Sequence, residues 1–578
     1  MTKAVNTMQQ IKFGGSILLM AAALLQGTAL AQTQPGGEYY IHGIYTPTIA
    51  NVQKIDLRPE PIDTILPDRP VSYQMIPAQA EIPAKVDTIA PARLNILAAQ
   101  PRLYRAYVKG GFGLYTTPIG EFHFNSTRSR KNAYGIHLRH MSSNGGIDDV
   151  GPNDYSFNNV DLFYKHFLPK HEASGRVIFD RRRISYYGYE ELTDSILNIQ
   201  NITPRADDDL KQVYTDIGFQ GRLRSMFTDS SLISYDADLE THAYSNLTGS
   251  REMNVRLSGQ LAKIEGSETY GLGILIDNNA YRREIGDVLQ IRQAGTLLGL
   301  TPTVSTRGDK YLVRVGAGIF VDAMGETTFH FYPQAYMEYR LFKDILVPYI
   351  GADGRKRRNT FRSLTRENPF LNGAPELKNT SERYDLYGGV RGSFTSDLGF
   401  DVRVSQRRLD DMPLYITLPN APYGDQMVPF YDRVDIFNAS ATLHYHIRDE
   451  WDVHGRVDIS SYKTELQAEA WNLPPYQLSV GARRSLRDKL FIKLEAQFLG
   501  SRPAKREYVS EEAGILVPRS EVVDLDGFLD LYLGLEYRYT KRLSVFLDAS
   551  NVSLSKYERW YKYPVQRGLV LGGFTYSF

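Results

Sequence analysis

Strict alternation of apolar and polar residues in segments of about ten residues is the feature that most constrains the fold of this chain. Between residues 104 and 578, apolar residues recur at every second position, as in the segments 492–498, 529–539 and 543–549. Side chains of a β-strand point to opposite faces with period two, so each segment predicts a strand with one apolar and one polar face. A membrane-spanning barrel requires this pattern, although a soluble β-sandwich would also show it.

The lengths of the gaps between the predicted strands favour the barrel. We count 22 strands, and 18 to 22 would fit the pattern. Connections after even-numbered strands are short, such as 448–450 and 540–542, whereas the long connections follow odd-numbered strands. The long connections are 188–210, 362–382, 410–429, 501–527 and 553–567. Such alternation is typical of outer-membrane barrels with periplasmic turns and extracellular loops.

The predicted fold class is therefore all-β, a large closed antiparallel transmembrane β-barrel. With an even number of strands, the two chain ends lie on the same side as the short turns. We accordingly expect a protein of the cell outer membrane with periplasmic N- and C-termini.

The first residues carry the pattern of a secretory signal peptide. Lys3 and Lys12 supply positive charge, an apolar run extends from Gly14 to about Leu25, and residues 29–31 fit a cleavage site of small residues. The run is short for a membrane-spanning helix, and no later segment reaches about 18 consecutive apolar residues. A chain without such a helix can cross a membrane only as a barrel.

Residues 32–103 differ in composition from the rest of the chain. They contain ten prolines in 72 residues, for example Pro59 and Pro61. Proline at this density blocks helices and central strands and favours extended chain. Apolar residues still recur at 62–66, so an extended periplasmic arm and a disordered linker both remain open. The predicted domains are a signal peptide (1–31), a Pro-rich arm (32–103) and a barrel (104–578).

The overall composition narrows the functions of the chain. The formal net charge is only +1 at pH 7, so no strongly basic field indicates a nucleic-acid partner. The absence of cysteine excludes disulfides, thiolate metal ligands and a cysteine nucleophile. No convincing catalytic motif is present, and we expect neither enzymatic activity nor a cofactor.

The end of the chain carries a family resemblance. Asn551, Tyr557 and the Tyr563-Pro564 step precede a Gly-rich segment, 572–578, that ends in phenylalanine. This ending, about 30 residues long, resembles that of TonB-dependent receptor barrels. The stretches 109–115 and 140–143 are similar to barrels of this type from Bacteroidetes that lack a plug. The resemblance implies transport across the outer membrane.

The chain departs from that family before its first predicted strand. Receptors of the family carry a folded plug domain and a short energy-coupling box there. Only the Pro-rich residues 32–103 occupy that place here, and 85–89 is only faintly similar to a coupling box. We therefore expect a barrel without its own plug and no TonB-driven import by this chain alone.

One histidine cluster is a candidate metal site. If 448–450 form a tight turn, His444 faces His454 and His446 faces Asp452 on the lumen side. Cross-strand Cβ atoms lie about 5 Å apart, so His444, His454 and Asp452 are suited to Zn²⁺ or Cu²⁺. The alternative is a polar lumen lined by ordinary hydrogen-bonding residues.

Basic clusters lie toward the outer ends of predicted strands. They are Arg181, Arg182, Arg183, Arg282, Arg283, Lys356, Arg357, Arg358, Arg407 and Arg408, with Arg355 beside them. Such a rim would bind lipopolysaccharide phosphates or select anions. The alternative is a solvated rim balanced by acids such as Asp410 and Asp411.

The last predicted strand ends in aromatic residues on one face. Phe574, Tyr576 and Phe578 resemble the C-terminal pattern that outer-membrane proteins present to the barrel assembly machinery. Besides this machinery, we expect membrane lipid and lipopolysaccharide as partners, and a periplasmic or lipoprotein partner for residues 32–103.

Two functions remain open from the sequence. A transport or channel role follows from the width of a barrel of about 22 strands, which its own wall side chains cannot fill. The alternative is a non-enzymatic scaffold or subunit of an outer-membrane complex that docks partners through its periplasmic arm.

Overall fold

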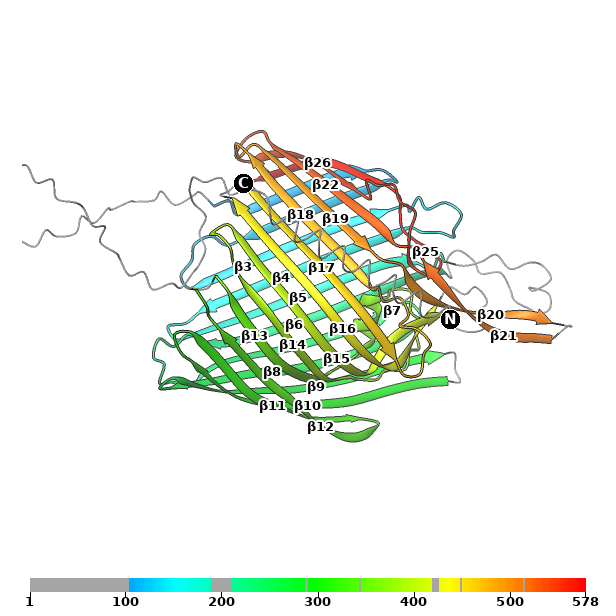
Figure 1. Ribbon diagram of the computed structural model, residues 1–578. Coiled ribbons are helices and arrows are strands. Elements are labelled where there is room, and N and C mark those ends of the chain that lie inside the picture. Colours follow the sequence, from blue (N-terminus) through cyan, green and yellow to red (C-terminus); the bar gives the residue numbers. More distant parts are fainter. Residues whose placement is uncertain are drawn as a thin grey trace, which may run out of the picture. The chain divides into compact units, whose positions relative to one another are not determined.

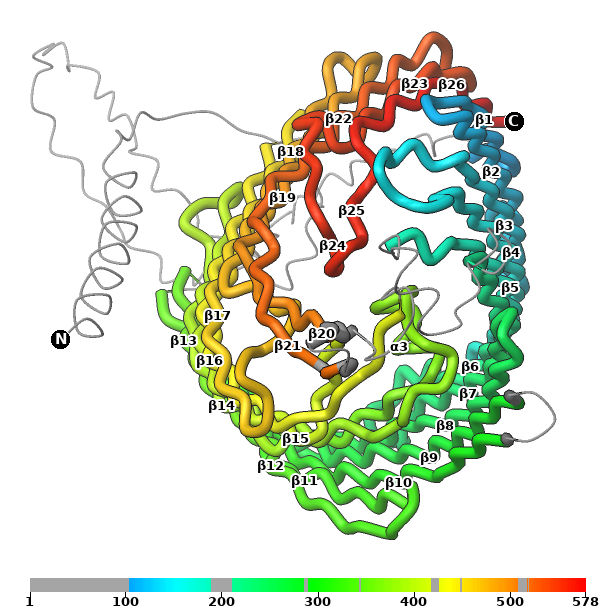
Figure 2. Tube along the Cα trace, turned by 90° about the vertical axis from the view of Figure 1, so that its right-hand side faces the viewer, coloured from blue at the N-terminus to red at the C-terminus, as the bar shows by residue number. Residues whose placement is uncertain are grey.

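The strands form a closed barrel. The computed structural model describes residues 103–188, 210–285, 289–342, 345–417, 426–447, 450–512 and 515–578. Within these residues 22 strands join in one antiparallel sheet, which closes because β1 (Ala106–Gly113) pairs with both β2 (Thr117–Asn125) and β26 (Leu569–Ser577) (Figures 1 and 2). The predicted fold class is confirmed. The predicted signal peptide and all of the predicted arm except Leu103 lie outside the described residues.

The remaining elements follow in chain order around the wall, and each predicted strand has a counterpart. The barrel strands are β3 (Asn132–Ser143), β4 (Tyr155–Phe167), β5 (His171–Ser185), β6 (Lys211–Ser225), β7 (Ser234–Asn246), β8 (Ser250–Glu265), β9 (Glu268–Ile285), β10 (Leu289–Arg307), β11 (Tyr311–Met324), β12 (Glu326–Tyr339), β13 (Val347–Arg357), β14 (Thr380–Ser393), β15 (Leu398–Thr417), β16 (Met427–Ile447), β17 (Trp451–Thr464), β18 (Tyr476–Leu486), β19 (Leu490–Leu499), β22 (Phe528–Arg538) and β23 (Leu543–Ser550). The connections contain the helix α3 (Phe361–Glu367) and the hairpins β20 (Arg502–Glu512)–β21 (Ile515–Leu525) and β24 (Glu558–Trp560)–β25 (Tyr563–Pro564). No helix among the described residues is long and apolar enough to span a bilayer.

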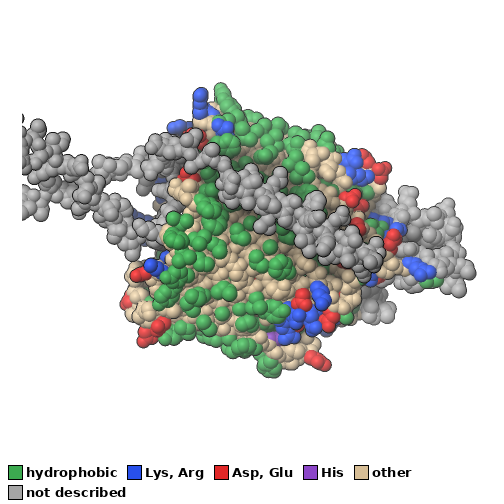
Figure 3. All heavy atoms as spheres, viewed as in Figure 1, with side chains coloured by type: hydrophobic (Ala, Val, Ile, Leu, Met, Phe, Trp, Pro, Cys, Tyr) green, Lys and Arg blue, Asp and Glu red, His purple; other side chains and the backbone are tan. Residues whose placement is uncertain are grey.

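The two faces of the wall differ as the alternation predicts. On β6, the side chains of Ile217 and Phe219 are exposed on the outer face, whereas Tyr214 and Asp216, which precede them at even-numbered positions, are buried on the inner face. Hydrophobic side chains cover much of the visible outer wall, and charged side chains gather toward its two ends (Figure 3). This distribution suits a wall whose outer face contacts lipid.

The longest connections all lie at one end of the barrel, although other connections at that end, such as 114–116 and 247–249, are as short as turns. Short turns such as 487–489 lie at the other end of the barrel, which we call the turn end. The opposite, loop end carries the long connections 358–379, 500–527 and 551–568. The predicted loop 410–429 is shorter than expected, because β15 and β16 continue their pairing beyond a bulge between Leu409 and Met412.

Glycines allow the first and last strands to approach closely at the closure. Gly111 of β1 lies opposite Gly573 of β26. A Cβ atom on Gly573 would lie 2.1 Å from the Gly110 carbonyl oxygen, a distance no side chain tolerates. Phe574 on the outer face of β26 and Phe578, directly after this strand, are both exposed.

We predict that Phe578→Ser lowers the level of folded barrel in the outer membrane several-fold, because the exposed aromatic ending is the expected assembly signal. The matched control is Phe394→Ser. Phe394 has a similar exposed fraction (56%, against 54% for Phe578) and lies at the same end of the barrel, in the connection between β14 and β15. Heat-modifiable migration of outer-membrane protein on gels measures the folded fraction. Equal levels of the two variants would contradict this role.

Candidate functional site

A short helix interrupts the connection between β13 and β14. The Thr360 hydroxyl accepts a hydrogen bond from the Ser363 backbone N–H (3.0 Å), and the Ser363 hydroxyl accepts one from the Thr360 N–H (2.9 Å). This capping box satisfies donors at the start of α3. The sequence predicted a strand through residue 361, but β13 ends at Arg357 because the chain turns into this helix.

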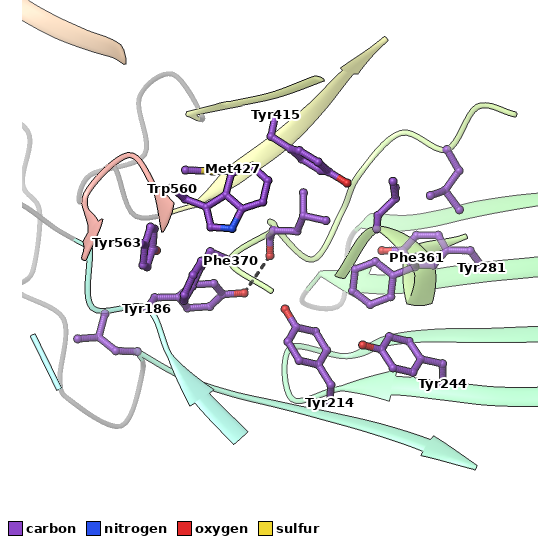
Figure 4. Packing of buried hydrophobic residues seen from close by; sticks show 14 residues of the cluster. Tyr186, Tyr214, Tyr244, Tyr281, Phe361, Phe370, Tyr415, Met427, Trp560 and Tyr563 are labelled. Carbon is purple, nitrogen blue, oxygen red and sulfur yellow. Dashed lines mark hydrogen bonds between the residues drawn. The ribbon is translucent and has the colours of Figure 1, made fainter. Parts of the chain in front are cut away.

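The helix lies inside the barrel. Phe361 is fully buried, and its ring packs against three tyrosines of the inner wall, with centroid distances of 6.4, 5.7 and 5.3 Å. These tyrosines are Tyr214 of β6, Tyr244 of β7 and Tyr281 of β9 (Figure 4). The end-on view places α3 within the ring of strands (Figure 2). The aromatic contacts supply the apolar part of the attachment.

One buried carboxylate holds both arginines of α3. The Oδ2 atom of Asp216 accepts hydrogen bonds from Arg362 (2.6 Å) and Arg366 (2.9 Å), and its Oδ1 atom lies 2.9 Å from Nδ1 of His242. Asp216 is only 1% exposed. The carboxylate is out of water, whereas the guanidinium groups of Arg362 and Arg366 are 21% and 39% exposed, so the carboxylate depends on its partners more than they depend on it. Asp216 therefore attaches the helix to the lumen wall, and we call its contacts with Arg362 and Arg366 the latch.

Two further carboxylates hold the beginning of the loop. The oxygens of Glu252 on β8 accept hydrogen bonds from the backbone N–H groups of Phe361 (2.6 Å) and Arg362 (3.1 Å). The Arg358 guanidinium lies 2.9 Å from Asp277 on β9, and both side chains are less than 10% exposed. Charge-assisted bonds of this kind are stronger than neutral ones.

Hydroxyl and amide groups of the wall hold the second half of the loop. The hydroxyls of Ser250 (2.6 Å) and Tyr281 both donate to the Gly373 carbonyl oxygen. The side-chain amide oxygen of Gln293 accepts a hydrogen bond from the Leu377 N–H (2.8 Å). The connection 358–379 is thus anchored along its length to β8, β9 and β10.

The connection 551–568 also reaches inward and meets the same loop. The ring of Tyr563 stacks on Phe370 with centroids 3.6 Å apart, and the two rings lie side by side in Figure 4. Tyr187 follows β5 in the chain, and its hydroxyl donates a hydrogen bond to the Pro564 carbonyl oxygen (3.0 Å). Burial raises the pKa of the Tyr187 phenol, so it remains a protonated donor. Two long connections therefore support each other across the loop end.

A cavity of about 490 Å³ lies between these connections and the wall. This volume is within the range of pockets that bind small molecules. Its lining includes Arg182, Tyr187, Arg366, Phe370, Arg559 and Gln566. The loop end therefore offers a space of ligand size with aromatic and charged walls.

Most of the basic residues of the predicted rim already have partners. The pairs are Arg182–Asp180 (3.5 Å), Arg183–Asp154 (2.7 Å), Arg283–Asn372 (3.1 Å), Lys356–Asp322 (3.3 Å), Arg358–Asp277 (2.9 Å), Arg407–Glu382 (4.0 Å) and Arg408–Asp435 (2.7 Å). Arg283 and Arg358 contact the inward loop or its wall instead of solvent outside. Arg181, Arg282 and Arg357 remain exposed.

Arg282 belongs to a row of arginines on the outer face at the loop end. It lies directly opposite Arg251 of β8 and Arg292 of β10. All three are exposed, and within the described part of the chain their side chains form no ion pair or hydrogen bond. Like charges placed directly opposite each other on a sheet are destabilising. The next residues on the same face are Met253, Ala280 and Ala294.

The structure confirms the predicted strand register at the histidine cluster but does not gather its three proposed ligands. His444 pairs with His454, and His446 pairs with Asp452, whose carboxylate lies 3.5 Å from the His446 Nδ1 atom. Among the described residues, three potential ligand atoms within 4.8 Å of one another occur instead at Glu121, His123 and His137. Sequence reasoning missed this group. The available signal was that Glu121 and His123 are two positions apart on β2, and so share one face, while His137 lies on the neighbouring strand.

Comparison with known proteins supports the architecture. No protein-family model and no curated protein sequence matches the chain. Solved structures do match. The FrpB iron transporter from Neisseria meningitidis has a TM-score of 0.62 and 9% identity, and the match covers 83% of this chain and 82% of that chain. The outer-membrane ferripyoverdine receptor of Pseudomonas aeruginosa has a TM-score of 0.61 and 11% identity, and the match covers 83% of this chain and 72% of that chain. The ferric-catecholate import receptor Fiu from E. coli K12 also matches, with a TM-score of 0.55 and 10% identity over 83% of this chain and 82% of that chain.

At these identities the likeness shows the fold. The chain is an outer-membrane-type β-barrel, and the barrel resembles that of TonB-dependent receptors, as the ending of the sequence implied. The three similar proteins are described as a transporter and receptors.

We predict that Asp216→Asn releases α3 from the wall. Trypsin should then cleave after Arg362 or Arg366 at least tenfold faster than in the wild type, because the latch loses its buried charge. The control is Asp236→Asn, since Asp236 also pairs with an arginine, Arg222, but contacts no loop. Mass spectrometry of limited digests measures the cleavage. Equal cleavage in both variants would show that Asp216 does not hold the helix.

Proposed function

We propose that this chain is an outer-membrane transport barrel whose lumen is closed by its own connections instead of a separate plug domain. The observation that carries the proposal is the attachment of connection 358–379 to the inner wall through Asp216, Glu252 and Asp277. A barrel of 22 strands is too wide for its wall side chains to fill. An open hole of that size would defeat the permeability barrier, so material inside the lumen is needed.

The chemistry of the attachment suits a gate. Ion pairs and hydrogen bonds, which water can replace when the loop moves, hold the loop together with a hydrophobic cluster that includes its Phe361, Leu364 and Leu371. The cavity of about 490 Å³ borders Arg366 of α3, so a solute bound there would contact the element that must move. We infer that a small solute opens the lumen from this cavity.

The proposed orientation places the loop end outside the cell. Long loops face outward and short turns face the periplasm in bacterial outer-membrane barrels. Both termini of the barrel then lie in the periplasm. Residues 32–103, as a Pro-rich arm, would dock a periplasmic or lipoprotein partner.

We predict that deleting residues 361–375 raises single-channel conductance and sensitivity of cells to large antibiotics, because this segment occupies the lumen. The matched control deletes 506–521, a similar length from the β20–β21 hairpin, which extends away from the barrel (Figure 1). The control should stay close to wild type. Unchanged conductance in the first deletion, or an equal rise in both, would rule out closure by 358–379.

We also propose that the outer arginine row binds the phosphate groups of lipopolysaccharide. Arg251, Arg282 and Arg292 lie side by side and exposed, next to an apolar stretch of wall, and no carboxylate among the residues that the structure describes pairs with them. Guanidinium groups bind phosphate oxygens with two hydrogen bonds each. An anionic lipid headgroup would relieve the repulsion among the three charges, while its acyl chains cover the apolar wall.

We predict that the triple variant Arg251→Gln/Arg282→Gln/Arg292→Gln co-purifies with several-fold less lipopolysaccharide than the wild type in mild detergent. The control changes two outward arginines, Arg383→Gln/Arg433→Gln, because Asp410, which both contact, and Glu465, which pairs with Arg433, already balance their charges. Lipopolysaccharide is quantified per mole of folded protein. Equal lipid in wild type and triple variant would exclude the row as a binding site.

A further inference from the structure

We propose that Glu121, His123 and His137 form a binding site for a late first-row divalent metal ion, Zn²⁺ or Cu²⁺, on the lumen face of β2 and β3. The site lies outside the loop network described above, and the proposal does not depend on a transport function. It also differs from the cluster around His444 that the sequence suggested.

The strand register brings the three side chains together. Glu121 and His123 are two residues apart on β2 and therefore share one face, and His137 lies directly opposite His123 on β3. The two imidazole rings stack with centroids 4.0 Å apart and planes 7° apart. Both Nε2 atoms approach the same carboxylate oxygen, Oε1 of Glu121, at 2.8 and 2.9 Å.

This arrangement has the ligand chemistry of a metal site. Two imidazole nitrogens and one carboxylate oxygen are a three-ligand set that zinc uses when a fourth position stays open for water or solute. Bonds of about 2.0–2.2 Å in tetrahedral geometry separate neighbouring ligand atoms by roughly 3.3 Å. The two nitrogen–oxygen distances, 2.8 and 2.9 Å, therefore need to widen by about half an ångström, and the stacked rings must rotate so that both Nε2 lone pairs face the ion.

The surroundings leave room for the open position. A cavity of about 450 Å³ in the lumen borders both imidazoles. The next carboxylate along the wall, Asp161, lies opposite His137 but is already held by Arg176 through a 2.7 Å hydrogen bond. Glu121 is thus the carboxylate available to the two histidines, and the fourth ligand would come from the lumen.

Metal binding would also tie β2 to β3 next to the place where the barrel closes. β2 is the neighbour of β1, which pairs with the last strand, β26. An ion held by both strands binds the folded barrel and not the unfolded chain. It is therefore expected to raise the unfolding temperature as its concentration rises.

The test uses the full barrel in detergent, stripped with chelator and then titrated with ZnCl₂ or CuSO₄ alone. We expect one tightly bound ion per chain. Glu121→Gln, His123→Gln and His137→Gln should each weaken binding at least tenfold, the scale seen when even an outer partner of a metal ligand is lost. Electron paramagnetic resonance of the Cu²⁺ form should show nitrogen splitting that weakens in His123→Gln.

Two controls locate the ion. His140→Gln changes an exposed histidine of β3 that hydrogen-bonds Asn158 instead of joining the cluster. His444→Gln/His454→Gln removes the pair suggested by the sequence. Both should bind metal as the wild type does. Three outcomes would overturn the proposal: no tightly bound ion in the wild type, loss of binding only in His444→Gln/His454→Gln, or equal small losses of affinity in every variant. Heat-modifiable migration on gels confirms that each variant is folded.

Discussion

The pairing of every backbone N–H and C=O group within the wall is the constraint on which the rest of this structure depends. Hydrocarbon offers no hydrogen-bonding partner, so a sheet that crosses it must have no free edge. The pairing of β1 with β26 removes that edge, and Gly111 and Gly573 allow the two strands to meet. Closure also assigns alternate residues to lipid and lumen, which explains the period-two pattern over 104–578.

Closure with 22 strands creates the second problem, a wide lumen. Carboxylates and tyrosines of the inner wall at the loop end hold the connection 358–379 inside the lumen. The carboxylates are Asp216, Glu252 and Asp277. These buried acids would be unfavourable if they were unpaired. The wall and the loop therefore depend on each other: the arginines and backbone N–H groups of the loop compensate the acids, and the acids fix the loop in the lumen.

Local patterns in the sequence predicted the wall well. Alternation located each strand, and the turn at 448–450 predicted the pairing of His444 with His454 that the structure shows. Such features depend on residues close together in the chain. The bulge after Leu409 has no comparable local signal, so the predicted loop 410–429 was too long.

The candidate site was much less predictable, because its contacts join distant segments. Asp216 and Arg362 are 146 positions apart, and no spacing rule connects them. The basic clusters were therefore interpreted as an outer rim, whereas Arg358 and Arg283 contact the inward loop or the wall beside it. The Thr360–Ser363 capping box was a usable signal for α3. The direction in which the helix folds depends on the closed wall.

The most direct test of closure by connection 358–379 is the current through a barrel whose loop can be locked chemically. The chain has no cysteine, and a Cβ atom on Gly373 would lie 3.1 Å from the Ser250 Oγ atom, so Ser250→Cys/Gly373→Cys can form one disulfide. Both changes are combined with Asp216→Asn, which weakens the latch. Our account predicts low single-channel conductance in the oxidised protein and a clear rise after reduction. Equal conductance in the two states, with the disulfide verified by mass spectrometry, would contradict it.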